Sequence, residues 1–168
     1  MSSNAPETSN DRDAVQREAL AFRDQFKSLL LATCSADGRP EISYAPFILG
    51  DDQAFHLFIS ELAAHTRNLR HNGQASVMLI EAENQAKNPF ARKRLTLQCH
   101  AQEVPPEAQD ELLERFETRF GNTVKLLRQL PDFHLFCLTV AQGSYVRGFG
   151  QAWALAGNGL EVLQLRQG

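Results

Sequence analysis

The feature that most constrains the fold is a series of β-forming runs, most of which are joined directly by tight turns. Asp37-Gly38 supplies the positive φ that a tight hairpin turn requires, and residues 50–53 make a second turn before the next run. A further turn is expected at Gln142-Gly143. The runs predicted as strands are residues 28–35, 41–49, 54–60, 75–81, 94–104, 133–140, 144–154 and 160–165. Strands joined in this way favour an antiparallel sheet over alternating βαβ units.

Helical patterns occur before the first strand, between two strands in the middle, and in one insertion. From Asp11, the apolar residues Val15, Ala19, Phe22 and Phe26 recur at spacings of four, three and four, which is one face of a helix. Further helices are predicted over residues 61–72, 105–120 and 122–130, each closed by a glycine or a proline. The whole pattern predicts a mainly β (α+β) fold, a closed antiparallel barrel of six to seven strands with peripheral helices.

The length of the chain fits one domain, and its net charge does not predict a strongly charged partner. We expect residues 1–10, which are rich in Ser and Asn, to be a disordered tail and residues 11–168 to form a single domain. The net charge of −3 gives no long-range attraction for nucleic acid or anionic lipid. Any anion site must therefore be local.

Cysteine content and hydropathy indicate a cytoplasmic protein. Three cysteines, Cys34, Cys99 and Cys137, cannot all pair within one chain, and each lies in an apolar strand-like run where a free thiol packs well. No apolar run approaches the ~20 residues that span a bilayer, and residues 1–12 lack a hydrophobic signal core. We therefore expect no membrane association.

Ser60 to Arg70 is the first candidate site, because a strand ends there and a helix begins. Backbone N–H groups at a helix N-terminus, the hydroxyls of Ser60 and Thr66 and the Arg67 guanidinium together suit a phosphate dianion, with His65 beside them. The alternative is a solvated helix face, with Arg67 and Arg70 pointing at water.

Arg92-Lys93-Arg94 forms a second candidate site at the start of a strand. Because side chains alternate along a strand, Arg94 faces the opposite way from Lys93, so at most two of the three cations reach one crevice. The alternative is that a basic strand entrance only protects an edge of the sheet.

Three other segments could contribute to a site. Ser43 and Tyr44 lie in SYAPF, where a flat ring could stack, although aromatic residues in strands mostly pack in cores or interfaces. Asp132 lies between a helix stop and a strand, a position that also suits a simple turn. The glycine-rich run 143–150 indicates bulges or close backbone approach, to a partner strand or to a ligand.

No motif points to a metal or to hydrolase and dinucleotide chemistry. The five histidines show no zinc spacing, and no Walker loop, GxGxxG or GxSxG motif is present. No metal ligand and no catalytic residue is assigned from these patterns.

The ordered set LLLATCSADGRPEISYAPFIL, HTRNLRHNGQASVMLIE, ARKRLTL, LPDFHLF and GSYVRGFGQAW resembles haem-utilisation proteins of HugZ/HutZ type. That family belongs to the pyridoxamine 5′-phosphate oxidase-like, FMN-binding split-barrel superfamily, and the resemblance covers about residues 13 to 160. It implies a split β-barrel that forms a homodimer with a cofactor site at the subunit interface.

For the flavin-binding relatives, the resemblance implies FMN as the cofactor of an oxidoreductase. Ser60, His65, Thr66, Arg67 and Arg94 match the positions that hold the FMN phosphate, and the isoalloxazine ring would lie near Ser43 and Tyr44. FMN is the first expectation.

For the haem-handling relatives, the resemblance implies that the same cleft accepts haem. Thr33, Arg92 and Asp132 match positions that tune the bound haem in those relatives. Asp132 would reach across the dimer to an axial histidine, and Arg92 and Arg94 would pair with the propionates. That histidine lies in a C-terminal extension of those relatives, whereas no histidine follows His134 here. Either haem binds differently, or this member keeps the barrel without oxygenase chemistry. A cofactor-free dimeric module is the third possibility.

Overall fold

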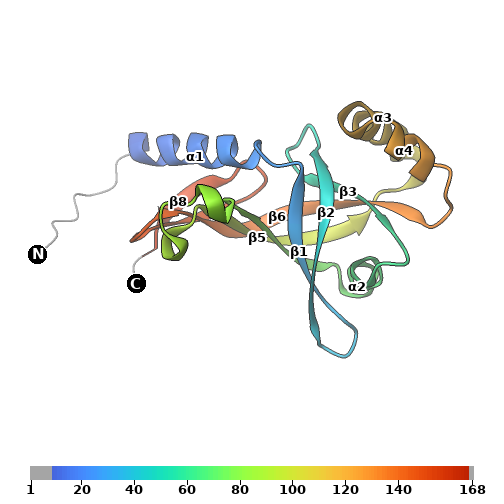
Figure 1. Ribbon diagram of the computed structural model, residues 1–168, viewed down its shortest axis with the longest axis horizontal. Helices are drawn as coiled ribbons and strands as arrows, with labels where there is room; N and C mark the ends of the chain where they lie inside the picture. Colours follow the sequence, from blue (N-terminus) through green and yellow to red (C-terminus); the bar gives the residue numbers. More distant parts are fainter. Residues whose placement is uncertain (1–8, 167–168) are drawn as a thin grey trace, which may run out of the picture.

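The computed structural model describes residues 9–166, in which six strands close into an antiparallel barrel and two more extend it (Figure 1). The sheet has the order β3-β2-β1-β4-β5-β6-β7-β8, and pairing of β3 with β6 closes the barrel. The strands are β1 (Ser28–Cys34), β2 (Pro40–Leu49), β3 (Phe55–Ser60), β4 (Gln74–Ile80), β5 (Arg94–Glu103), β6 (Phe133–Gly148), β7 (Gln151–Ala156) and β8 (Glu161–Leu165). The predicted barrel class is therefore confirmed.

Strand β6 runs through the position where a turn was expected, and this prediction was wrong. Its first half pairs with β3 and its second half with β7, while β5 pairs along both halves. Gly143 lies opposite Leu97 inside the ladder. A Cβ at Gly143 would lie 2.5 Å from the Thr96 carbonyl oxygen, so close approach to a partner strand explains this glycine. The hairpin turn lies instead between Gly148 and Gln151.

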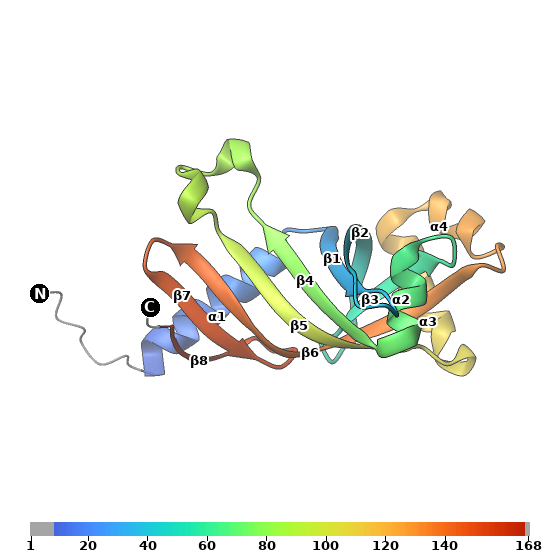
Figure 2. The ribbon, with the colours of Figure 1, turned by 90° about the horizontal axis from the view of Figure 1, so that it is seen from below.

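Helices cover the two ends of the barrel. Figure 2 shows α1 (Ser9–Arg23) along the β7–β8 extension, with α3 (Gln109–Phe120) and α4 (Asn122–Leu127) at the opposite end. Helix α2 (Ala64–Asn72) connects β3 to β4 and ends at Gly73, whose φ of 64° is left-handed. The short 3₁₀ helices are η1 (Glu83–Gln85), η2 (Pro89–Ala91) and η3 (Pro106–Ala108). None of the helices within residues 9–166 is long and apolar enough to cross a membrane.

Two apolar cores hold these elements together. The larger one fills the barrel and receives Val15, Ala19 and Phe22 from α1, which are three of the four residues of the predicted helix face. The fourth, Phe26, packs against the same core but lies beyond the helix, which ends at Arg23. The smaller one lies under α3, where Phe116 packs near Leu135. Helix α1 begins at Ser9, two residues earlier than expected, so the predicted tail 1–10 is helical at its last two residues. Residues 1–8 lie outside the described residues.

Candidate functional site

Strand β2 and the start of α2 form an open groove of about 490 Å³, called here the β2–α2 groove. Four residues predicted for the site meet in it: Thr33, Ser43, Tyr44 and His65. The remaining lining residues are Glu41, Ile42, Ala63 and Ala64. The side chains come together because the antiparallel pairing of β1 with β2 brings Leu31 opposite Ser43, and α2 lies against both strands.

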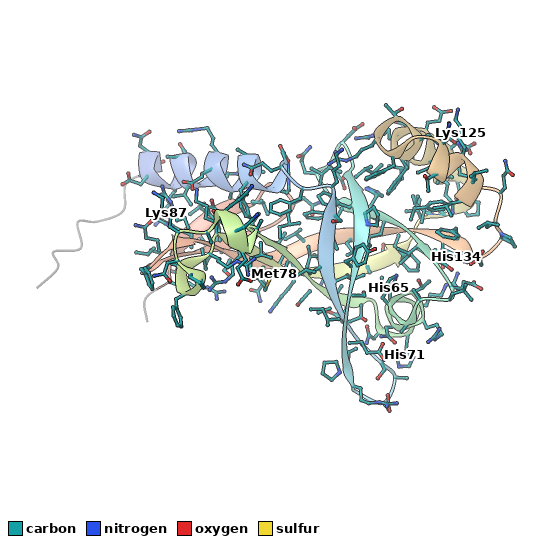
Figure 3. All side chains as sticks on the ribbon, in the orientation of Figure 1. His65, His71, Met78, Lys87, Lys125 and His134 are labelled. Carbon is teal, nitrogen blue, oxygen red and sulfur yellow. The ribbon has the colours of Figure 1, made fainter. Side chains whose placement is uncertain are left out.

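His65 is held in the groove wall by a hydrogen bond at one ring nitrogen. Its Nδ1 lies 2.8 Å from the Ser43 hydroxyl, which also lies 3.3 Å from the Leu31 carbonyl oxygen. If the hydroxyl donates to that carbonyl, Nδ1 is the donor to Ser43 and Nε2 carries the lone pair. Nε2 is buried and has no hydrogen-bond partner within the described chain. Figure 3 shows His65 on the side of α2 that faces β1 and β2.

Burial lowers the pKa of His65 and, on β3, the pKa of His56. Both rings are therefore neutral in the folded protein at neutral pH, as a haem or metal ligand must be. The unfolded chain binds protons at these histidines near an ordinary pKa of about 6.5. It follows that acidification through this range favours the unfolded state.

We predict that the free energy of unfolding falls as the pH is lowered from about 7 towards 5, since both folded pKa values lie below the unfolded value. Urea unfolding at a series of pH values measures this dependence. The double variant His56→Gln/His65→Gln should show a flatter profile over the same interval. A wild-type profile that is level or rises on acidification would contradict the prediction.

Asn68 does not line the groove but holds two of its polar residues from behind, a role that was not predicted from the sequence. Its buried amide donates to the Thr33 hydroxyl at 3.0 Å and to a Glu41 carboxylate oxygen at 2.8 Å. Asn68 lies three residues after His65, so the two share a helix face. That spacing is the signal in the sequence that links Asn68 to the site.

The predicted phosphate corner is closed by hydrogen bonds within the protein. The Ser60 hydroxyl donates to Asp132 at 2.6 Å, and the Thr66 hydroxyl donates to the Ser60 carbonyl at 2.6 Å. Arg67 lies exposed and donates to the Glu61 carbonyl at 3.4 Å, as in the solvated-face alternative. The corner therefore joins β3, α2 and the start of β6, and it fixes the Asp132 carboxylate.

A charged cluster next to this corner was also missed. Glu61 and Glu103 both bind Arg70, and both lie within 2.9 Å of ring nitrogens of His134. Figure 3 shows His134 apart from His65. Glu61 follows β3, and Arg70, Glu103 and His134 lie in α2, β5 and β6. Since these residues come from four elements, no local spacing in the sequence could reveal them.

Arg92 and Arg94 do not line the β2–α2 groove of their own chain. Arg92 donates to the Glu81 carbonyl, and one of its nitrogens lies 3.8 Å from Glu83. Arg94 donates to the Arg92 carbonyl at 3.0 Å. Both side chains thus brace the loop between β4 and β5.

Comparison with known proteins agrees with this architecture. The family model described as pyridoxamine 5′-phosphate oxidase matches residues 15–147. Residues of this chain are 41% identical over 157 positions to a Vibrio cholerae protein named haem oxygenase HutZ, covering 92% of this chain and 89% of that protein. The chain therefore belongs to the haem-utilisation family within the pyridoxamine 5′-phosphate oxidase-like superfamily.

Two solved structures show how far the similarity extends. One is of HutZ, described as the haem storage protein from Vibrio cholerae, with a TM-score of 0.73 and 43% identity, covering 80% of this chain and 95% of that chain. The other is of Campylobacter jejuni ChuZ, with a TM-score of 0.80 and 30% identity, covering 91% of this chain and 63% of that chain.

Proposed function

We propose that this protein binds haem in the β2–α2 groove as a cytosolic homodimer and serves haem oxygenation. The observation that carries the proposal is the 41% identity, over 92% of the chain, to a protein named as a haem oxygenase. The three free cysteines, Cys34, Cys99 and Cys137, fit a reducing cytosol. Haem iron, when bound, supplies the oxygen chemistry, and the protein supplies binding and orientation.

The residues of the groove fit a haem group. Among the groove-lining residues within 9–166, His65 is the only histidine, and its Nε2 has no partner. Ser43 fixes the ring orientation through Nδ1, and burial keeps the ring neutral. We infer that His65 is the residue of this chain that contacts the iron side of the ligand, with a rotation of the buried ring that exposes Nε2 to the groove.

The apolar edge of the groove supports a homodimer. Ile42 and Tyr44, neighbours of Ser43 on β2, are 75% and 69% exposed. Two large apolar side chains so exposed beside a groove are typical of an interface or of a ring-binding surface. In such a dimer the groove is covered by a second subunit, and Arg92 or Arg94 reaches the propionates from the partner rather than from the same chain.

Asp132 has a positioning role in this proposal. Ser60 donates to one of its oxygens at 2.6 Å, which leaves the other oxygen to accept a hydrogen bond. The main-chain carbonyl of Asp132 accepts from the Glu61 N–H at 2.8 Å, so the residue is held on both its side chain and its backbone. A carboxylate fixed in this way can orient a hydrogen-bond donor of the partner subunit at the interface; it does not orient His65, whose Nδ1 is held by Ser43.

FMN has less support than haem. Its phosphate would need Thr66 and Arg67 as donors, but the Thr66 hydroxyl donates to the Ser60 carbonyl, and Arg67 lies on the exposed face of α2. The three relatives described above carry names that refer to haem or to no cofactor. FMN occurs in more distant members of the superfamily, and we rank it second.

Parallel titrations test the proposal. We expect haem to give a Soret band that saturates at one haem per subunit, and FMN to keep its free fluorescence at micromolar protein. Sedimentation of the same sample should give a dimer. Quenching of flavin fluorescence without a saturating Soret band would contradict the haem proposal and favour FMN.

A further inference from the structure

We propose that a second cavity, separate from the β2–α2 groove, binds a small organic anion with a carboxylate or phosphate on an apolar body. The cavity has a volume of about 510 Å³ and lies where the C-terminal end of α1, the end of β2 and helix α3 meet. Figure 1 shows the end of α1 and helix α3 near the upper ends of β1 and β2, whereas α2 lies beside their lower part. We call it the arginine cavity, after Arg23, Arg115 and Arg119 in its wall.

Arg23 places a buried positive charge at this cavity. The residue is 2% exposed, and its Nε and Nη2 bind Asp24 at 2.9 Å and Gln53 at 2.8 Å. Its Nη1 is buried with no hydrogen-bond partner in residues 9–166. A guanidinium stays charged, and leaving one of its buried N–H groups without an acceptor is costly, so an additional anion nearby is stabilising. Arginine is seldom buried this completely, and a buried donor without a partner requires an explanation, which a ligand would provide.

Arg115 and Arg119 add two further cations from α3. Arg115 binds Asp51 at 2.9 Å and the Leu49 carbonyl at 2.6 Å. Arg119 donates to the Phe26 carbonyl at 2.7 Å, and its guanidinium carbon lies 5.7 Å from the Phe47 ring centroid. The carboxylates that pair with these three arginines are Asp24 and Asp51, and both are exposed. One positive charge is left over, in a chain whose net charge is −3.

The apolar part of the wall defines the rest of the ligand. Phe26, Phe47 and Leu49 line the same cavity, which is large enough for a ring or a short chain. Inorganic phosphate would satisfy only the cations and leave this surface in contact with water. An anion attached to an apolar body satisfies both surfaces, which is why we assign an organic anion.

Calorimetric titration with phenyl phosphate tests the proposal. We expect saturable binding at one site per chain, with inorganic phosphate and benzyl alcohol each at least about tenfold weaker. Benzoate in place of phenyl phosphate shows whether the site prefers a carboxylate or a phosphate. Arg119→Gln, at the exposed mouth, should weaken phenyl phosphate about tenfold, and Arg23→Met should weaken it at least as much if that variant folds.

Arg39→Gln is the matched control, since Arg39 is an exposed arginine in the β1–β2 turn and does not line this cavity. It should bind phenyl phosphate like the wild type. The proposal is overturned if millimolar phenyl phosphate does not bind. It is also overturned if benzyl alcohol or inorganic phosphate binds as tightly as phenyl phosphate, or if Arg119→Gln binds phenyl phosphate as tightly as the wild type does. Loss of binding in protein saturated with haem would overturn it as well, because that places the probe in the β2–α2 groove. Haem binding should be unchanged in Arg119→Gln, so the two proposals can fail separately.

Discussion

Replacing Gly143 with alanine is expected to lower the free energy of unfolding by about 2–3 kcal/mol, because the new methyl group has no space. Gly143 is buried in β6 opposite Leu97. Its Cβ would lie 2.5 Å from the Thr96 carbonyl oxygen, 2.6 Å from Leu97 Cδ2 and 3.1 Å from Leu97 Cα. Two of these atoms belong to the backbone of β5. Strands β5 and β6, which pair along most of their length, must therefore move apart.

Gly148→Ala is the matched control at the other end of the same strand. No heavy atom lies within 4 Å of a Cβ built there, and its φ is not left-handed. Its unfolding free energy should stay within about 1 kcal/mol of the wild type. Urea unfolding of both variants measures the difference. If the two variants are equally stable, strands β5 and β6 are not packed as closely as described.

Replacing His65 with alanine is expected to weaken haem binding about 10- to 100-fold and to change the absorption spectrum of the bound haem. The physical reason is that His65 is the histidine in the groove wall, with one nitrogen held by Ser43 and the other without a partner. Haem titration followed by absorbance measures both effects. Ser43→Ala should give a smaller change in the same direction, since it frees the ring without removing it.

His71→Ala is the control for this prediction, because His71 lies on the same helix but is exposed and does not line the groove. Its haem affinity and spectrum should match the wild type. If His65→Ala and His71→Ala have the same haem affinity and the same spectrum, His65 does not belong to the proposed site.

Much of the fold could be predicted from local patterns in the sequence. Turn residues such as Asp37-Gly38 and the apolar face of Val15, Ala19 and Phe22 act over a few residues, and the structure has the expected hairpin and helix there. The prediction of a turn at Gln142-Gly143 was wrong because a glycine in a strand-like run can indicate either a turn or close contact with a neighbouring strand. Local sequence cannot separate a turn from close contact with a distant strand, here β5.

The site was predictable only in part, for a related reason. Ser43, Tyr44 and His65 were singled out segment by segment and Thr33 by the family resemblance, and the barrel places all four in one groove. The bonds of Asn68 to Thr33 and Glu41 join residues 35 and 27 positions apart, and the pairing of Glu61 and Glu103 with His134 joins separate elements. Such contacts depend on the closure of the sheet. Arg92 and Arg94 were expected at the cofactor cleft, but neither lines the β2–α2 groove of its own chain.

The central claim, that haem lies in the β2–α2 groove at the contact between two subunits, is tested most directly by a crystal structure of the haem complex. We predict porphyrin density against β2 with Tyr44 beside the ring, His65 on the iron side, and a second subunit covering the groove. Porphyrin density in any other place, or haem bound to a monomer with His65 remote from the iron, would contradict the account.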